Sequence, residues 1–538
     1  MELGQMCEEG GRCICTRVGF GPKAEYPDTP DKAVSYFGLY KTESTSTFVP
    51  TVHSRCHIMS LRQVVKYTFY SGHSFKFSST FNSQKRNLCS SNPSTLPFQK
   101  MPLDVLVVGA GVCGPAVAML LQRSDQRHNI TIVERSSTLR ATGQQIDLKN
   151  QAPHILRKMG LLDEIRALCV NETGLEVVDS AGKQIAHFGA SASGERRIGL
   201  TSEYEIMRGD MVQFLYDASI KQNAKLEAGP GHRIAYIFGQ SITSLYQRAQ
   251  GVNVTFSDGR KHRYDLVIGA DGQNSRTRRL AFGQEANDAA FKTLGVHASY
   301  FSIPRIAGEG TLARGHLAPG RKMIYTRTSD RPVTGALLFT MDESLRLKAS
   351  YKESLESQKE AFAEVFKDMD WQTDRLITGM KNSDDFYASE LGQIKMDRLS
   401  TGRVVLLGDA GYCPSPFTGL GTNLCLVGAY VLAGELARQE NDVMGGLQCY
   451  EEKMRPFIVE CQQFSHKSLE FLFPSTRLGV WSMQNLAWVV SKLTRFFPRS
   501  QKGDQHGERL PEYPELNLPF DMGSRSSTEG SRHGDLAR

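Results

Sequence analysis

An α/β fold is predicted by three features of this 538-residue sequence. The first is a strand, tight turn, helix and second strand that follow one another over residues 103–134. The second is a group of strand-like segments in the middle of the chain, which predicts a sheet of its own. The third is a buried strand, Arg403 to Leu407, that leads through a glycine- and proline-rich loop into an apolar helix. Together they predict a parallel-sheet domain, an inserted β-sheet domain and C-terminal helices.

The first strand leads into a glycine motif. Leu103 to Val108 is a continuous apolar run, as expected of a strand that is buried on both faces. Gly109, Gly111 and Gly114 follow at G-x-G-x-x-G spacing, and an apolar helical pattern continues to Leu121. Because the motif lies between a strand and a helix, it has the context that dinucleotide binding requires.

Each residue type in this unit suits a dinucleotide. Gly109 permits the sharp turn, Gly111 lets the backbone approach a pyrophosphate, and Gly114 lets the helix pack closely on the sheet. The helix N-terminus presents free N–H groups to the phosphates. Glu134 ends the second strand, twenty-five residues after Gly109, where its carboxylate can accept the ribose hydroxyls of an adenosine. The alternative interpretation is a glycine-rich turn without a ligand.

Composition excludes several other classes of protein. The net charge is +7, but residues 1–102 hold 12 Lys and Arg against 7 Asp and Glu, so the rest of the chain is close to neutral. No basic patch interleaved with aromatic residues stands out, and we expect no nucleic-acid partner. The 11 cysteines show no metal-ligand spacing. We expect no metal site and a reduced protein without a disulfide framework.

The two ends of the chain differ from the middle. Residues 1–102 lack periodicity, and no acidic residue occurs between Ser44 and Leu103. We interpret them as a disordered extension or as non-coding sequence included in the gene model, with Met101 as the working start; a mitochondrial transit peptide is the alternative. Residues 501–538 are predicted to be a disordered tail. Without a targeting segment, the expected location is cytoplasmic.

No run of eighteen uncharged apolar residues occurs, and we predict no transmembrane segment. The nearest candidate is Leu478 to Ser491, whose apolar residues recur at helical spacing. It predicts a packed C-terminal helix, and superficial membrane contact is the alternative.

The middle of the chain alternates strands with helices. Glu176 to Phe188 predicts a hairpin that turns at Ala181-Gly182, and Asp210 can cap an amphipathic helix that Arg208 precedes. Residues 234–246 and 252–268 predict further strands. Strand-like pieces within residues 282–395 then predict a sheet that covers a pocket: Thr293–Ser302, Lys322–Arg327 and Val333–Thr340, followed by a charged helix over Tyr351–Phe366.

Two later stretches carry further motifs. Asp271-Gly272 begins a D-G-x-x-S-x-x-R pattern directly after a strand. Asp409 follows the strand that ends at Leu407, where its carboxylate can accept hydrogen bonds from a polyol chain. Gly421 and Thr422 begin the next helix and can offer backbone N–H groups to a polar ring edge or a phosphate.

These three motifs, in this order over residues 103–440, resemble the single-component flavin-dependent aromatic hydroxylases, also called group A flavoprotein monooxygenases. The stretch G-Q-Q-I-D-L from Gly143 is also similar to the subgroup that contains tetracycline-inactivating flavin monooxygenases. The resemblance implies a Rossmann-like FAD-binding domain (residues 103–281, with a strand excursion near 175–200, and 396–440). It also implies an inserted β-sheet substrate domain (282–395) and C-terminal helices (441–500).

The resemblance implies roles for individual residues. It places Arg208 near the isoalloxazine ring, and Asp271 where the family serves both FAD and NAD(P)H. The family often has histidine where this chain has Tyr412, which loosens any assignment of ring contacts there. The complete set of residues that we expect to bind FAD is Gly109, Gly111, Gly114, Glu134, Arg135, Gly143, Arg208, Asp271, Asp409, Gly421 and Thr422.

The chemistry that the resemblance implies is hydroxylation of an aromatic or enolic small molecule by O₂, through a flavin C4a-hydroperoxide. No second G-x-G-x-x-G motif follows a strand, so NADPH or NADH is expected to dock transiently without a domain of its own. The catalytic base stays unassigned, and Arg233, Tyr236 and Tyr246 on the middle strands are the candidates.

Three other functions remain open from the sequence. A flavin-dependent oxidase, dehydrogenase or halogenase could use the same scaffold, although the W-x-W-x-I-P stretch of halogenases is not evident. A catabolic phenol hydroxylase would have the same motifs as an enzyme of secondary metabolism, and the subgroup favours a polyketide-type substrate. A non-enzymatic binding module is the third alternative.

Overall fold

The computed structural model describes residues 101–140, 142–189, 204–225, 233–342, 345–440, 442–463, 466–493 and 510–519. The predicted N-terminal extension, up to residue 100, lies outside these ranges, as do both ends of the predicted tail.

A six-stranded sheet forms the centre of the FAD-binding fold. In spatial order its strands are β17 (Ser400–Thr401), β18 (Val404–Leu406), β11 (Leu266–Gly269), β1 (Asp104–Val108), β2 (Asn129–Glu134) and β7 (Ile234–Phe238). All neighbours pair in parallel except β17 and β18. Strands from both predicted segments of this fold therefore lie in one sheet, and the predicted Rossmann-like α/β class is confirmed.

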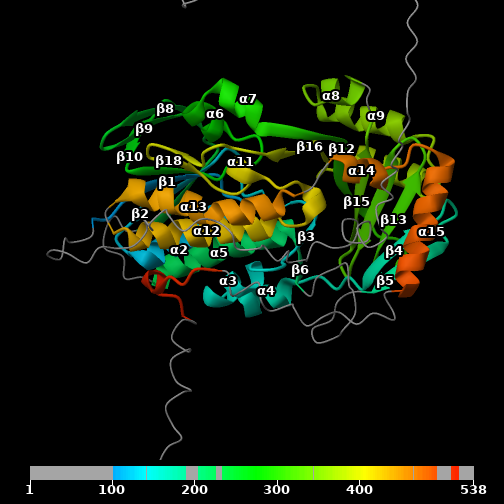
Figure 1. The fold of residues 1–538 in the computed structure, drawn as a ribbon, viewed down its shortest axis with the longest axis horizontal. Coiled ribbons are helices and arrows are strands. Elements are labelled where there is room, and N and C mark those ends of the chain that lie inside the picture. The colour runs from blue at the N-terminus through cyan, green and yellow to red at the C-terminus, as the bar shows by residue number, and fades with distance from the viewer. Residues whose placement is uncertain are drawn as a thin grey trace, which may run out of the picture. The chain divides into compact units, whose positions relative to one another are not determined.

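The apolar run in β1 is explained by the two layers that cover the sheet. Val105 and Val107 belong to the core that the helices cover, whereas Leu106 and Val108 pack with the three-stranded sheet on the other face. Successive side chains of a strand point to opposite faces, so a strand between two layers is apolar throughout. Figure 1 shows the helices below the sheet and the small sheet above it.

The helical layer is α2 (Cys113–Ser124), α5 (Arg208–Lys225), α12 (Gly421–Arg438) and α13 (Val443–Cys461). The small sheet is β10 (Lys261–Tyr264), β9 (Gly251–Phe256) and β8 (Ile242–Arg248). Short helices complete this part of the chain: α3 (Ala152–Lys158), α4 (Leu162–Leu168), α6 (Arg276–Phe282), α7 (Gln284–Ala290), α11 (Asp409–Tyr412) and the 3₁₀ turn η1 (Pro416–Thr418).

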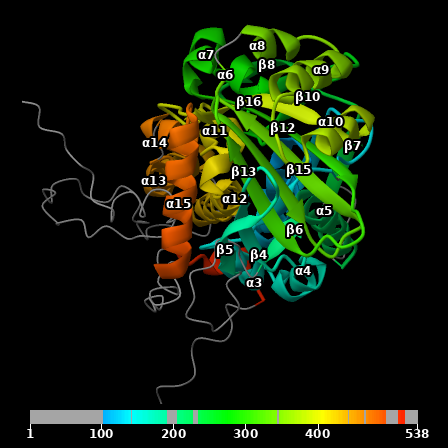
Figure 2. The ribbon, with the colours of Figure 1, turned by 90° about the vertical axis from the view of Figure 1, so that its right-hand side faces the viewer.

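A seven-stranded sheet forms the predicted substrate domain (Figure 2). In spatial order its strands are β16 (Tyr387–Ile394), β12 (Phe291–Pro304), β15 (Val333–Thr340), β14 (Lys322–Thr328), β13 (Leu312–Ala318), β4 (Gly174–Val178) and β5 (Gln184–Gly189). The three strands predicted in this region are β12, β14 and β15, whereas β13 was not predicted. Helices α8 (Leu345–Ser350), α9 (Leu355–Phe366) and α10 (Thr373–Asn382) add an apolar layer.

The predicted hairpin over residues 176–188 is β4 and β5, and Gly182 has the positive φ of +78° that its turn requires. Its place in the fold differs from the prediction, which assigned it to the FAD-binding domain. Because β4 pairs in parallel with β13, the hairpin extends the substrate sheet.

Helix α15 (Arg477–Leu493), which follows α14 (His466–Leu472), packs one face on this sheet. Ala487 and Val490 contact Phe188 of β5, as predicted for a packed C-terminal helix. The opposite face exposes Trp481 and Trp488. In the part of the chain that the structure describes, no helix is both long and apolar enough to cross a membrane.

Residues 510–519 correct the prediction of a disordered tail. This segment contains the 3₁₀ turn η4 (Pro514–Leu516) and inserts a fully buried Tyr513 against α12. The Tyr513 phenol donates a hydrogen bond of 2.6 Å to the buried Glu435 carboxylate. Burial of a large aromatic ring and a hydrogen bond to a buried acid together explain why this short polar segment is ordered.

Candidate functional site

The glycine turn between β1 and α2 has the geometry that its sequence predicts. Gly109 has φ +110°, and a Cβ atom there would lie 2.5 Å from the carbonyl oxygen of Ala270. A Cβ on Gly114 would overlap the carbonyl oxygen of Gly109, so glycine is required for the helix to start this close to the strand. Among the described residues, the only atom within 4 Å of a Cβ on Gly111 would be Arg208 Nη2, at 4.0 Å. The backbone at Gly111 is therefore open to a ligand.

The carboxylate of Glu134, at the end of the neighbouring strand β2, forms hydrogen bonds with the backbone of this turn. Its two oxygens accept hydrogen bonds from the backbone N–H groups of Ala110 and Ser136, each at 3.0 Å. A carboxylate offers about four lone-pair sites, so acceptor capacity remains for a ribose. The next residue, Arg135, has an exposed side chain.

Arg208 joins the glycine turn to the loop that contains Gly143. Its Nη1 donates to the carbonyl oxygen of Thr142 at 3.1 Å, and its backbone N–H donates to the carbonyl oxygen of Gln144 at 3.0 Å. Gly143 has φ +126°, and a Cβ there would lie 3.1 Å from Arg208 Cδ. The two-stranded ribbon of β3 (Gln145–Asp147) and β6 (Glu205–Met207) holds these two segments together.

Asp409 and the start of α12 face the same region. A Cβ on Gly421 would lie 3.8 Å from Asp409 Oδ1, so this carboxylate lies at the helix N-terminus next to Thr422. The side chain of Asp409 reaches solvent, although protein surrounds it on most sides. Desolvation by that protein raises the pKa of the Asp409 carboxyl, while Cys413 and the charge of Arg208 oppose the rise.

The D-G-x-x-S-x-x-R motif connects the parts of the site. Asp271 accepts hydrogen bonds from the hydroxyls of Ser275 and Thr277 at 2.5 and 3.0 Å, which fixes the loop after β11. Arg278 is buried and donates to the carbonyl oxygen of Ala410 at 2.8 Å. Its buried guanidinium therefore ties the second motif to the third, one residue after Asp409.

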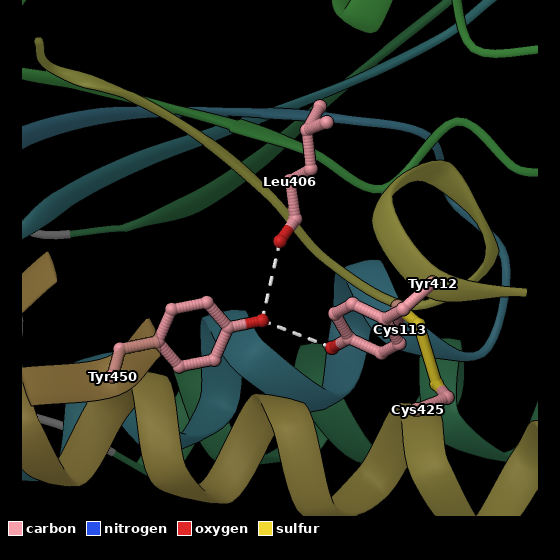
Figure 3. Close-up of a disulfide and its surroundings, with 5 residues drawn as sticks. All are labelled: Cys113, Leu406, Tyr412, Cys425 and Tyr450. Atoms are coloured by element: carbon pink, nitrogen blue, oxygen red, sulfur yellow. Dashed lines mark hydrogen bonds between the residues drawn. A yellow bond between two sulfur atoms is a disulfide. The ribbon is translucent and has the colours of Figure 1, made fainter. Parts of the chain in front are cut away.

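Tyr412 occupies the position where the family often has histidine, and its side chain is used for packing. The ring is buried, and its hydroxyl lies 2.9 Å from that of Tyr450, which donates to the carbonyl oxygen of Leu406 at 3.1 Å (Figure 3). A Cβ on Gly428 would overlap the Tyr412 hydroxyl, which shows how closely α12 packs here. The third motif of this chain therefore has a structural tyrosine in place of the family's histidine.

A disulfide joins Cys113 and Cys425, with Cα atoms 5.8 Å apart (Figure 3). The prediction that these cysteines are reduced apolar fillers is wrong in this structure. Cys113 begins α2 inside the glycine motif, and Cys425 lies in the first turns of α12. Two residues 312 positions apart in the sequence show no spacing signal, so only the tertiary structure could pair them.

The three candidates for a catalytic base have their contacts elsewhere. Tyr236 lies on the edge strand β7, and its hydroxyl is 2.7 Å from the hydroxyl of Ser219 in α5. Burial raises the pKa of this phenol, which opposes a role as a base. Tyr246 is 62% exposed on the small sheet, and Arg233 is exposed just before β7. The structure does not bring these residues to Asp409 or Arg208.

An aromatic wall of the substrate domain lies beside the third motif. Phe417 in η1 contacts Phe339 of β15, with ring centroids 5.5 Å apart, and Phe473 after α14 at 6.0 Å. Tyr300 and Leu337 belong to the same apolar cluster. Because Phe417 lies between Asp409 and Gly421 in the sequence, this wall adjoins the predicted flavin site. No periodicity in the sequence indicated that these aromatic residues would meet.

The arrangement fits the group that the resemblance implies. Gly111 leaves the backbone open, Glu134 retains acceptor capacity, and the exposed Asp409 lies beside a helix N-terminus. Arg208 supplies a positive charge between them. These are the donor and acceptor types that a dinucleotide with a ribityl chain and a pyrophosphate requires.

Comparisons with known proteins agree with this geometry. The model of the FAD binding domain family matches residues 102–465. The FAD-dependent monooxygenase asL6 of Sarocladium schorii is 40% identical over 426 residues, which are 78% of this chain and all of that protein. The flavin-dependent monooxygenase eupH of Phoma sp is 35% identical over 77% of this chain and 97% of its own.

A solved structure, that of the tetracycline destructase Tet(55), superimposes with a TM-score of 0.61 at 28% identity, covering 78% of this chain and all of that one. The match to the family model alone extends over more than half of the sequence. The chain therefore belongs to the FAD binding domain family, and it is an FAD-dependent monooxygenase of the aromatic hydroxylase type.

Proposed function

We propose that this enzyme uses NADPH or NADH and O₂ to hydroxylate an aromatic or enolic small molecule of polyketide type. The observation that carries the proposal is the contact between Phe417 and Phe339. It brings an apolar aromatic wall of the substrate sheet against the loop that runs from Asp409 to Gly421. An electron-rich ring held on that wall would lie beside the flavin ring.

In this proposal, different residues of the chain bind the cofactor and the substrate. Bound FAD, once reduced, supplies the electrons that activate O₂. Arg208 and Asp409 hold the cofactor, while the partly exposed Phe417 contacts the substrate and excludes water. The buried rings of Phe339 and Phe473 hold Phe417 in place. Exclusion of water favours oxygen transfer over the release of H₂O₂.

The class of substrate is supported by the relatives. The similar fungal proteins asL6 and eupH are named as FAD- or flavin-dependent monooxygenases, and the similar solved structure is named as a tetracycline destructase. Tetracycline is a polycyclic aromatic polyketide. A role in secondary metabolism fits these relatives better than the catabolism of simple phenols.

Oxygen-18 labelling tests the reaction. Purified enzyme with FAD, NADPH and a panel of polycyclic phenols should consume NADPH faster when the substrate is present, and one atom of ¹⁸O₂ should enter the product. NADH in place of NADPH compares the two reductants. A dehydrogenated product that contains no ¹⁸O would identify an oxidase or dehydrogenase and would contradict the proposal.

A further inference from the structure

Three charged side chains meet in the interior between the flavin-side ribbon and the substrate sheet. Glu205 begins β6, Arg327 lies near the end of β14, and Glu172 lies just before β4. The side chains of Glu172, Glu205 and Arg327 are 0%, 2% and 12% exposed. None of the three belongs to the glycine, D-G or Gly408-Asp409 motifs.

Arg327 is shared unequally between the two carboxylates. Its Nε and Nη2 donate to the two oxygens of Glu172 at 3.1 and 3.0 Å, in a bidentate pair. Gln145 of β3 adds a third donor to Glu172, at 3.3 Å. The guanidinium also forms an ion pair with Glu205, through the same Nη2 that donates to Glu172.

Among the residues that the structure describes, the groups around the two acids supply no second positive charge. Asp147, opposite Glu205 in the ribbon, is itself an acid and forms its ion pair with Lys149 at 2.9 Å. Tyr325 of β14 faces the cluster as a phenol, and the pKa of that phenol is raised well above its usual value by burial and by the nearby carboxylates. Two buried carboxylates therefore have one guanidinium between them.

One guanidinium leaves a net negative charge on two buried carboxylates, which is costly in a protein interior. Desolvation raises the pKa of Glu172, and Arg327 opposes that rise. When two acids are coupled through one guanidinium, their titrations belong to the pair and not to either residue alone. The cost falls if the pair keeps one proton, since the cluster is then neutral.

We propose that Glu172 and Glu205 share one proton at neutral pH, and that this acid pair positions the β3–β6 ribbon on the substrate sheet. Arg327, on the substrate sheet, also contacts the backbone of the ribbon: its Nη1 donates to the carbonyl oxygen of Gln145, at 3.3 Å. The ribbon leads directly into Arg208 and follows the Gly143 loop. Glu172, Glu205 and Arg327 are thus positioning residues.

The pair gives the flavin site a defined pH dependence. Below the raised pKa the proton is present and the ribbon is held against the sheet. As pH rises through that pKa the proton leaves, the carboxylates repel each other, and the ribbon loosens. The predicted effect of pH on the flavin site rests on the proposed function, in which Arg208 and the Gly143 loop contact FAD. The predicted protonation of the acid pair does not depend on those contacts.

Infrared spectroscopy tests the proton directly. The wild-type protein at neutral pH should show the carbonyl band of a protonated carboxyl in an alkaline-minus-neutral difference spectrum. Glu205→Gln and Glu172→Gln should each remove one carboxyl from that band, whereas the control Glu176→Gln should leave it unchanged. Glu176 is a matched control because it is also largely buried on β4 but has two basic neighbours, Arg314 at 3.2 Å and His187 at 3.8 Å. A band that both cluster variants leave unchanged would overturn the proposal.

A titration of FAD affinity tests the positioning role. The dissociation constant of FAD should rise about tenfold between about pH 7 and pH 10 in the wild type and in Glu176→Gln. In Glu205→Gln this rise should be absent, because glutamine cannot lose the proton. Equal pH dependence in all three proteins would refute the positioning role. An FAD affinity that Arg208→Ala leaves unchanged would instead refute the proposed flavin contacts.

Discussion

Arg208 lies at the centre of the predicted flavin site. Its guanidinium lies near Gly111, donates to the loop that contains Gly143, and acts electrostatically on Asp409. One side chain thus links three parts of the chain that lie far apart in the sequence. The sequence identified it only by its position before an amphipathic helix and by resemblance to the family.

We predict that Arg208→Ala weakens FAD binding about tenfold to a hundredfold, because hydrogen bonds to charged groups contribute about 1.5–3 kcal/mol. Flavin fluorescence during titration of the apoprotein measures the dissociation constant. Arg248→Ala is the control, since Arg248 is exposed at the end of β8 and its guanidinium only lies over the Tyr246 ring. Equal affinity in both variants would contradict the role of Arg208.

Substitution of Gly111 and of Gly114 by alanine should have different effects on stability and on FAD binding. Gly114→Ala should destabilise the fold by about 3 kcal/mol, because the new Cβ overlaps the carbonyl oxygen of Gly109. Gly111→Ala should leave the apoprotein stable and weaken FAD binding, because its Cβ has room in the fold but stands where the pyrophosphate approaches. Thermal unfolding without FAD and flavin titration separate the two effects; a stable Gly114→Ala protein would disprove the packing argument.

At the scale of elements, helix α12 organises both the site and the fold. Its first residues lie beside Asp409, Asn423 accepts a hydrogen bond from the backbone N–H of Ala152 at the start of α3, and its last turns receive Tyr513. The apolar character of α12 was evident from the sequence. The packing of residues 510–519 on α12 was not evident from the sequence, because this segment is short and is polar apart from the residues that it buries.

We predict that Tyr513→Ala lowers the free energy of unfolding by about 4 kcal/mol, because it removes a buried ring and one of the donors to the buried Glu435. Tyr513→Phe keeps the ring and should cost about 2 kcal/mol. Urea unfolding followed by circular dichroism gives both values. Tyr246→Ala serves as a control, since its ring is 62% exposed. If Tyr513→Ala unfolded at the wild-type urea concentration, the segment would not be docked on α12.

At the scale of the whole molecule, the FAD-binding fold is assembled from two distant segments. Strands β1 and β18 lie in one sheet on either side of β11, although the substrate domain separates them in the chain. The Cys113–Cys425 disulfide joins the same two segments next to the glycine turn. The bond therefore closes a loop that contains the entire substrate sheet.

Closing a loop of 312 residues restricts the unfolded chain strongly. The chain entropy that such a loop removes corresponds to on the order of 5 kcal/mol, with smaller values common in practice. We expect dithiothreitol to lower the midpoint of thermal unfolding of the wild-type protein by more than it lowers that of the Cys113→Ser/Cys425→Ser double variant, in which Cys449 is still disulfide-bonded. Identical melting of the wild type with and without the reductant would show that the bond contributes nothing.

The FAD-binding fold, the glycine turn and the strands on either side of it could be predicted from the sequence alone. These features depend on local properties: the period of apolar residues, the backbone freedom of glycine, and motifs whose parts lie within thirty residues of one another. The roles of Gly109 and Gly114 in the turn therefore follow from their spacing between a strand and a helix.

Contacts between residues that lie far apart in the sequence could not be predicted and became visible in the folded structure. The aromatic wall at Phe339 and Phe417, the pairing of Cys113 with Cys425, and the sharing of Arg327 by Glu172 and Glu205 all join segments far apart in the sequence. Such contacts leave no periodic signal, because each depends on how complete sheets and helices pack. The same limit explains why Tyr236 and Tyr246 were plausible from their strands and yet lie away from the site.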